Sequence, residues 1–152
     1  MTRTTIRPAG LQDAAALAAL KAEWATGGAV PSSEADAASA AMAAFLRRQG
    51  DAAVCRIAEE DGRPVGAAWL IVFERVPSLG QDRRTSADVQ SVYVSPSARG
   101  RGVGAALVAA LLEEADRRGI PRITVHSSSG ATRLYERAGF VVSADLLQRE
   151  RG

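Results

Sequence analysis

The residues best suited to chemistry form one glycine-rich turn, Arg99-Gly100-Arg101-Gly102-Val103-Gly104. Apolar patterning predicts a strand directly before this turn and a helix directly after it. Glycines leave backbone N–H groups uncovered, and a helix N-terminus carries partial positive charge, so the turn is suited to bind a pyrophosphate. The guanidinium groups of Arg99 and Arg101 would add counter-charge. A flexible turn with two solvated arginines is the alternative, because a glycine-rich turn alone has low specificity.

The spacing within the turn argues against two familiar nucleotide sites. It lacks the Lys-Ser/Thr pair of a P-loop, which disfavours ATP hydrolysis. Its glycines do not follow the G-x-G-x-x-G order of dinucleotide sites, and the strand before it does not open the chain. We therefore expect neither kind of site.

Cysteine and histidine usage limits the remaining chemistry. Cys55 and His126 are the single residues of their types, so we expect no internal disulfide and no zinc ligand set. Cys55 shares an alternating pattern with Val54 and Ile57, which predicts a buried, inert thiol. Metal catalysis is not expected.

The elements that must position the turn follow from hydrophobic periodicity. Residues 88–94, stopped by Pro96, predict a strand, and residues 103–119 predict an amphipathic helix. A strand at 122–126 completes a strand-helix-strand unit, whose strands should be parallel with a right-handed crossover. Three shorter elements are expected downstream: a helix at 130–137 and closing strands at 140–142 and 146–148.

The N-terminal half supplies two helices and a hairpin. In chain order, we expect a strand at 4–7, helices at 11–24 and 32–50, and strands at 53–59 and 65–73. The Asp61-Gly62 pair between the last two strands is a strong hairpin signal, so these strands should pair antiparallel. Residues 77–84 form an irregular segment long enough for a working loop.

These elements predict one domain over residues 1–152. The expected fold is α+β in three layers: a mixed, mostly antiparallel sheet with one parallel strand pair and flanking helices. A composition of 47% hydrophobic and 24% charged residues excludes a disordered tail, a fibrous repeat and a disulfide-stapled module. No apolar run approaches the roughly 20 residues of a membrane span, and the N-terminus lacks a secretion signal. We therefore expect a cytoplasmic protein with no membrane partner.

The charge pattern bears on nucleic acid as a partner. The net charge is +2, and every basic residue except Lys21 is arginine. Three basic pairs, at 47–48, 83–84 and 117–118, lack the interleaved aromatics on which single-strand binders stack bases. We therefore expect no nucleic-acid partner.

A known family shares the residues around the turn. Val92-Tyr93-Val94-Ser95-Pro96 followed by residues 99–104 resembles the central motif of the GNAT superfamily of acetyl-CoA-dependent N-acetyltransferases, [Arg/Gln]-x-x-Gly-x-[Gly/Ala]. Residues 131–140 resemble the second family motif, and residues 6–14 are similar to its usual opening. The resemblance spans nearly the whole chain and implies a strand pair that splays apart at the cofactor.

The resemblance implies a role for several residues. Main-chain groups of Val92 and Val94 would pair with the pantetheine arm and the acetyl carbonyl, and residues 99–104 would take the pyrophosphate. Tyr135 would protonate the departing thiolate, although a buried ring with an idle hydroxyl is the alternative. Ser128 stands where many members carry an asparagine that contacts the cofactor. Capping of the following helix is its alternative role.

The general base is less clearly indicated. Asp88 and Gln90 are expected on the same strand face as Val92 and Val94, which makes Asp88 a weak candidate. His126, at the end of the next strand, titrates near neutrality and could accept a proton directly or through water. Local hydrogen bonding or packing is the alternative for this histidine.

Three function classes follow from these residues. The first is an N-acetyltransferase, in which a primary amine of a small molecule or peptide attacks the acetyl-CoA thioester directly. The second is a non-catalytic acyl-CoA-binding regulatory module, and the third is a basic nucleic-acid-associated protein. Tyr135 favours the first, because a binding module needs no proton donor beside the sulfur.

Two further expectations concern the acceptor and the assembly. Loops at 27–34 and 77–84 should set the identity of the acceptor amine. An uncovered sheet edge near the C-terminus favours a homodimer.

Overall fold

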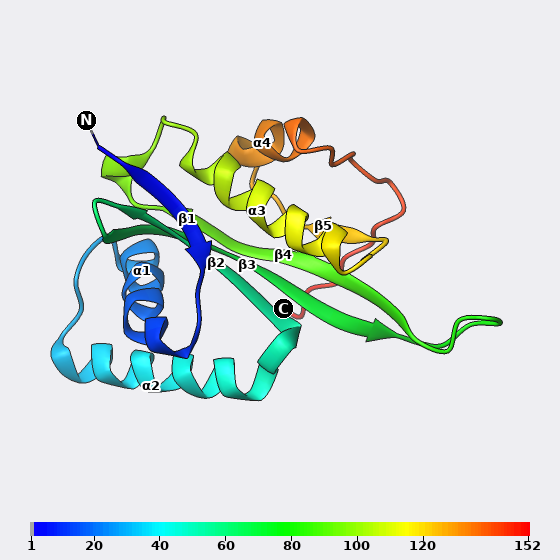
Figure 1. Ribbon diagram of the computed structural model, residues 1–152, viewed down its shortest axis with the longest axis horizontal. Coiled ribbons are helices and arrows are strands. Elements are labelled where there is room, and N and C mark those ends of the chain that lie inside the picture. Colours follow the sequence, from blue (N-terminus) through cyan, green and yellow to red (C-terminus); the bar gives the residue numbers. More distant parts are fainter. Residues whose placement is uncertain (1) are drawn as a thin grey trace.

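A computed structural model describes residues 2–152, and Figure 1 shows a central sheet between two helical layers. The five strands lie in the order in which they occur along the chain. They are β1 (Thr4–Pro8), β2 (Ala53–Glu60), β3 (Arg63–Arg75), β4 (Arg84–Val94) and β5 (Ile123–Val125). β1 to β4 pair antiparallel, and β4 pairs with β5 in parallel. The predicted α+β fold with one parallel pair is confirmed.

Helices cover both faces of this sheet (Figure 1). α1 (Ala14–Thr26) and α2 (Ser32–Gln49) lie on one face, and α3 (Val103–Arg117) and α4 (Thr132–Arg137) lie on the other. Short 3-10 turns precede or follow them: η1 (Leu11–Asp13), η2 (Gly50–Ala52), η3 (Pro96–Ala98) and η4 (Ser129–Ala131). Among residues 2–152, no helix is long and apolar enough to cross a membrane.

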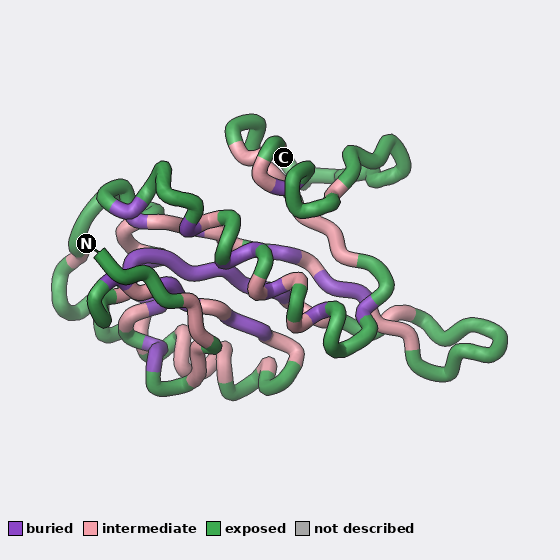
Figure 2. Tube along the Cα trace, turned by 45° about the horizontal axis from the view of Figure 1, so that its top comes forward, coloured by how far each residue is buried: buried purple, intermediate pink, exposed green. Residues whose placement is uncertain are grey.

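Each face of the sheet has its own apolar core. Leu70, Leu107 and Leu111 belong to the core on the α3 side, and Leu17 and Ile57 belong to the core on the α1 side. All five are at most 1% exposed. Each such side chain contributes about 1.5–3 kcal/mol to stability through burial. Figure 2 shows the buried residues concentrated along the middle of the sheet, which is therefore a firm base for the loops at its edge.

The two hairpins of the sheet differ in form. Between β2 and β3, Asp61 (φ 50°) and Gly62 (φ 80°) make the tight turn that the Asp-Gly pair predicts. Between β3 and β4, both strands continue further than expected, and only residues 76–83 remain as an irregular tip. This tip projects beyond the rest of the sheet and is exposed (Figure 2).

The two closing strands predicted near the C-terminus are absent. Residues 140–142 and 146–148 have no strand pairing, and the sheet ends at β5. Each segment offers only three strand-forming residues, and β5, itself three residues long, presents a short edge to pair with. Apolar side chains are left exposed here: Val141, Val142, Leu146 and Leu147.

A bulge in β4 changes which of its side chains lie on the same face of the sheet. Tyr93 pairs with Ala67 and Gln90 pairs with Trp69, so two residues of β4 oppose one residue of β3. Ser91 lies in the bulge with a positive φ of 54°. The extra residue reverses the alternation. Gln90 therefore lies on the α1–α2 side, and the prediction that it shares the face of Val92 and Val94 was wrong.

The valines beyond the bulge pack on the α3 side. β3 accommodates the bulged strand through Gly66, where a Cβ would lie 2.8 Å from the carbonyl oxygen of Tyr93. A larger residue at this position would push the two strands apart. The sequence pattern thus contains one sign of the bulge, a glycine in the middle of a strand.

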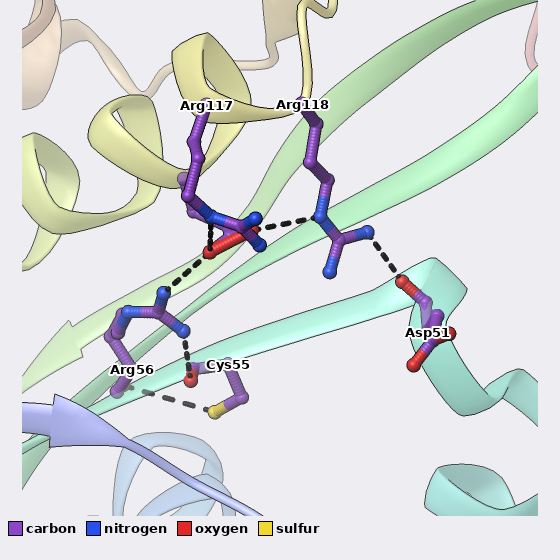
Figure 3. A network of polar contacts seen from close by, with 6 residues as sticks. Asp51, Cys55, Arg56, Arg117 and Arg118 are labelled. Atoms are coloured by element: carbon purple, nitrogen blue, oxygen red, sulfur yellow. Dashed lines mark hydrogen bonds and ion pairs between the residues drawn. The ribbon is translucent and has the colours of Figure 1, made fainter.

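The C-terminal end of α3 is joined to β2 by a polar network (Figure 3). The Glu114 carboxylate accepts hydrogen bonds from Arg117, Arg118 and Arg56, at 3.0, 2.9 and 3.5 Å respectively. Arg118 also donates to the carbonyl of Asp51 at 2.7 Å. The arginines lower the pKa of Glu114 to about 2, chiefly through the hydrogen bonds from Arg117 and then Arg118. Glu114 is therefore ionised at neutral pH and fixes the position of α3 on the sheet.

Candidate active site

The glycine turn adopts the backbone that its composition favours. Gly100 and Gly102 have φ values of 78° and 79°, a region that L side chains rarely adopt. Gly102 is also the N-cap of α3, and its carbonyl accepts the N–H of Ala106 at 3.0 Å. The first N–H groups of α3 have no intrahelical partner. The turn therefore presents backbone donors at the positive end of a helix dipole.

β4 and β5 separate next to this turn. Their parallel pairing covers only Ala87, Val89 and the residue between them. β4 continues to Val94, so its last five residues lie beyond the paired segment. The resemblance predicts a splay at this position, and the main chain around Val92 and Val94 borders the cleft described next.

A cleft of about 770 Å³ lies between the end of β4, the turn and α4. It brings together nine of the predicted site residues: Val92, Val94, Arg99, Gly100, Gly102, Val103, Gly104, Ser128 and Tyr135. We call it the donor cleft. Arg101 and His126 are not among its lining residues.

The Arg101 side chain is held against β2. Its guanidinium lies 2.6 Å from the carboxylate of Glu60, whose side chain is only 8% exposed. It also donates to the carbonyl of Ser97 at 3.1 Å. The guanidinium that we expected to neutralise a pyrophosphate is therefore paired with a protein carboxylate, and it holds the turn on the sheet.

The donor cleft instead draws positive charge from α4. Arg133 and Arg137 line it together with Arg99, and none of its lining residues is acidic. Sequence reasoning did not identify Arg133 and Arg137, although a spacing of four residues places both on one face of a helix. α4 comes close to the turn because Gly104 has no side chain. A Cβ at Gly104 would lie 3.3 Å from Leu134.

Arg99 lies across the mouth of the donor cleft. Its Nε donates to the carbonyl oxygen of Val94 at 2.8 Å, and its guanidinium lies 5.7 Å from the centre of the Tyr93 ring. The Val94 carbonyl keeps a second lone pair for a ligand, and a ligand that takes the place of this guanidinium would release it. Arg99 is then free to face an anionic group at the turn.

Tyr135 is buried at the inner wall of the donor cleft, with 7% of its surface exposed. Its ring packs edge-on against Phe140, with 5.6 Å between the ring centroids. Burial raises the pKa of the Tyr135 hydroxyl, so the hydroxyl is protonated at neutral pH. This is the protonation state that a proton donor requires.

The other sequence candidates take different positions. Ser128 stands at the N-cap of η4 but makes no side-chain capping bond within residues 2–152, while it lines the donor cleft. His126 is exposed and lines a separate cavity with Asp88 and Thr124. The Thr124 hydroxyl donates to the Asp88 carboxylate. The structure therefore does not bring His126 and Tyr135 into one cavity.

α1 contributes residues that sequence reasoning did not name as candidate site residues. Trp24 is 48% exposed, lines the donor cleft and stacks on Tyr93, with 5.5 Å between ring centroids. Glu23 accepts a hydrogen bond from Ser95 at 3.1 Å. Burial, followed by the Glu23 charge, raises the pKa of Tyr93. These contacts fix α1 against the end of β4.

The lone cysteine is remote from this chemistry. Cys55 is 2% exposed, as the alternating pattern predicts. Burial raises the pKa of its thiol to about 12. Because the thiolate is the reactive form, Cys55 is inert near neutral pH.

Known proteins share the sequence pattern and the fold of this chain. The pattern of the acetyltransferase (GNAT) family matches residues 17–140. Glucosamine 6-phosphate N-acetyltransferase of Trypanosoma brucei brucei is 31% identical over 99 residues, which are 65% of each chain and thus less than two thirds of that relative. A GCN5-related N-acetyltransferase of Ralstonia eutropha JMP134 is 26% identical, with a TM-score of 0.72 over 99% of this chain and 100% of the other. A predicted acetyltransferase of Clostridium acetobutylicum, solved with acetyl-CoA, is 21% identical, with a TM-score of 0.76 over 97% and 96% of the two chains.

Proposed function

This chain belongs to the acetyltransferase (GNAT) family, and from that premise we propose that it transfers the acetyl group of acetyl-CoA to a primary amine. One observation carries the proposal: the donor cleft joins backbone donors at the start of α3, an arginine cluster without carboxylates and a buried, protonated tyrosine. A polyanionic ligand with a thiol leaving group fits these features.

Different residues of the donor cleft would bind different parts of acetyl-CoA. The N–H groups of residues 100–104 would bind the pyrophosphate, since the Arg99 N–H already donates to the Pro96 carbonyl. Arg99, Arg133 and Arg137 would be the cations that face the phosphates. The end of β4, at Val92 and Val94, pairs with β3 but not with β5, so it offers main-chain groups on its free side to an extended pantetheine arm. Ser128 lines the same cleft and can supply one further hydrogen bond.

The chemical step needs an oxyanion donor and an acid. When bound, acetyl-CoA supplies a thioester carbonyl and a thiolate leaving group. The main-chain N–H of Val94 donates to the carbonyl oxygen as negative charge develops there. Tyr135 gives its proton to the sulfur. Burial raises the pKa of Tyr135 above that of an ordinary tyrosine, so transfer of its proton to a thiolate with a pKa of about 8.5 is uphill, and a positioned hydrogen bond between the two groups would lower this cost.

The acceptor amine must lose a proton to become nucleophilic. Histidine is the side-chain type that most often accepts protons in enzymes, and His126 is the single histidine of the sequence. Because it lies outside the donor cleft, we propose that it accepts this proton through water. Replacement of His126 by glutamine should then shift the acidic limb of the pH–rate profile.

An assay of free thiol released from acetyl-CoA, run against a broad amine panel, tests the function. We expect thiol release that requires an amine and matches the acetylated product one for one by mass spectrometry. Saturable acetyl-CoA binding without thiol release for any amine would instead support a non-catalytic acyl-CoA-binding module. Absence of both would refute the proposal.

A further inference from the structure

A second cavity, of about 530 Å³, lies between α1, α2 and the sheet. Five alanines from the two helices line it, and Met42, Phe45, Trp69 and Ile71 complete its apolar wall. The polar lining is limited to Lys21, Gln90 and Ser91. None of its lining residues is acidic, so Lys21 supplies the charge of this cavity. We call it the acceptor cavity.

The acceptor cavity and the donor cleft adjoin at two places. Along β4, Ser91 lines the cavity and the next residue, Val92, lines the cleft. Along α1, Lys21 lines the cavity, and Trp24, one turn later, lines the cleft. The Lys21 ammonium lies 4.8 Å from the centre of the Trp24 ring and donates to the Ser91 hydroxyl at 2.9 Å. Lys21 therefore stands at the junction of the two spaces.

The backbone at this junction is also unusual. Ser91 has a positive φ of 54°, which is uncommon for a residue other than glycine. Such backbone positions cluster at functional sites. Here the bulge turns Gln90 and Ser91 toward the acceptor cavity, and Val92 and Val94 remain at the donor cleft. The bulge in β4 thus lies at the border between the acceptor cavity and the donor cleft.

We propose that the acceptor cavity binds an α-amino acid with an apolar side chain, which makes this the acceptor class of the acetyltransferase proposed above. The apolar wall takes the side chain, and the Lys21 ammonium pairs with the α-carboxylate at the junction. The α-amine is on the same carbon as the carboxylate, so it is directed past Lys21 to the donor cleft. The inference rests on the proposed function, because it assigns the amine to the acetyl group delivered there.

The lining disfavours other amine classes. A polyamine or aminoglycoside carries several positive charges, and the cavity offers no carboxylate to pair with them while Lys21 repels them. An amino sugar phosphate carries several hydroxyls, which the apolar wall would leave without hydrogen-bond partners. The loops at 27–34 and 77–84, which we expected to set the acceptor, do not line this cavity. Faces of α1 and α2 and residues of β3 and β4 line it instead.

Matched substrates test the assignment of the carboxylate to Lys21. L-phenylalanine and phenethylamine share a phenyl ring and a primary amine, and only the amino acid has a carboxylate. We expect kcat/KM for L-phenylalanine to exceed that for phenethylamine by about 10- to 100-fold, the usual effect of one charge-assisted hydrogen bond. Lys21→Met should reduce this ratio toward one, mainly through KM for the amino acid, and Lys21→Arg should recover part of it. Equal losses for both amines in Lys21→Met would overturn the assignment.

A steric pair of variants tests the cavity itself. Ala38 lines it, whereas the neighbouring Ala37 is exposed on α2 and does not. Ala38→Trp should lower turnover of L-phenylalanine at least about 10-fold, with acetyl-CoA affinity retained by calorimetry, and Ala37→Trp should keep the wild-type rate. Wild-type rates in both variants would overturn the inference. Thiol release with spermidine or glucosamine 6-phosphate, but with no apolar amino acid, would also overturn it and leave the acetyltransferase function intact.

Discussion

Tyr135 is the residue on which the chemical step depends most. Its ring is fixed against Phe140, and burial raises the pKa of its hydroxyl. Tyr135→Phe keeps the ring and removes only the hydroxyl. We predict that kcat falls by about 10²–10⁴-fold, the usual range for loss of a general acid, while calorimetry shows acetyl-CoA affinity within a few-fold of wild type.

An unchanged rate in Tyr135→Phe would contradict the role of Tyr135 as the proton donor. If chemistry is rate-limiting and Tyr135→Phe turns over an established amine at the wild-type rate from pH 6 to 9, the ring only fills the core. The sulfur would then take its proton from water or from the amine.

Sequence reasoning named nine of the residues that line the donor cleft, and their roles stay predictions. The glycine turn and Tyr135 carry local motifs, and the structure places both at one cleft. Sequence reasoning missed the guanidinium groups of Arg133 and Arg137 and the ammonium of Lys21, because their roles depend on which way a helix faces. The pairing of Arg101 with Glu60 could not be predicted, since these residues meet only through the fold.

At the scale of elements, α3 carries the turn at one end and the Glu114 network at the other (Figure 3). Arginines lower the pKa of Glu114 from its ordinary 4.5 to about 2. A carboxyl whose pKa is lower in the folded state stabilises the fold above the unfolded pKa, and this stabilisation is lost as pH falls through the folded pKa. The network should therefore stabilise α3 above about pH 4.5 and progressively less toward pH 2.

We predict that Glu114→Gln lowers the free energy of unfolding by roughly 1–2 kcal/mol at pH 7, the usual effect of losing hydrogen bonds to a charged group, with the contribution of exposed Arg117 reduced by solvent screening. Urea unfolding followed by circular dichroism measures this difference. The gap between variant and wild type should shrink as pH falls from 4.5 toward 2. Glu113→Gln, on an exposed neighbouring side chain, is the matched control and should stay near wild type. A gap independent of pH would contradict the role of the charge.

Elements were easier to predict than their irregularities. Apolar patterning located the four main helices and the five strands, including α4 and β5, which are only six and three residues long. The bulge at Ser91 was missed, since nothing in the local alternation marks an inserted residue. The two closing strands were predicted wrongly, because a short β-prone run forms a strand only when a neighbouring edge is long enough to pair with it.

At the scale of the whole molecule, the open edge of the sheet favours self-association. β5 is the last strand of the sheet. Four apolar side chains that follow it in the chain are 64–90% exposed: Val141, Val142, Leu146 and Leu147. Exposed apolar side chains next to an unpaired strand edge form a surface suited to a second copy. We predict a homodimer, with a mass by light scattering of twice the 15.9 kDa chain.

Two variants separate this surface from other exposed apolar positions. Leu147→Asp should shift the mass toward that of one chain. Leu79→Asp, at the fully exposed hairpin tip, should leave the dimer intact. A single-chain mass for the wild-type protein at micromolar concentration would exclude the dimer.

The central claim is that the glycine turn binds the pyrophosphate of acetyl-CoA, and calorimetric titration of Gly102→Val tests it most directly. Gly80 in the hairpin tip has nearly the same backbone, φ 75° against 79°, and a Cβ at either glycine meets nothing within 4 Å. Gly80→Val therefore matches the backbone strain without touching the donor cleft. With both variants folded by circular dichroism, we predict that Gly102→Val loses about 100-fold or more in acetyl-CoA affinity and that Gly80→Val keeps the wild-type value. Unchanged affinity in folded Gly102→Val would contradict the account.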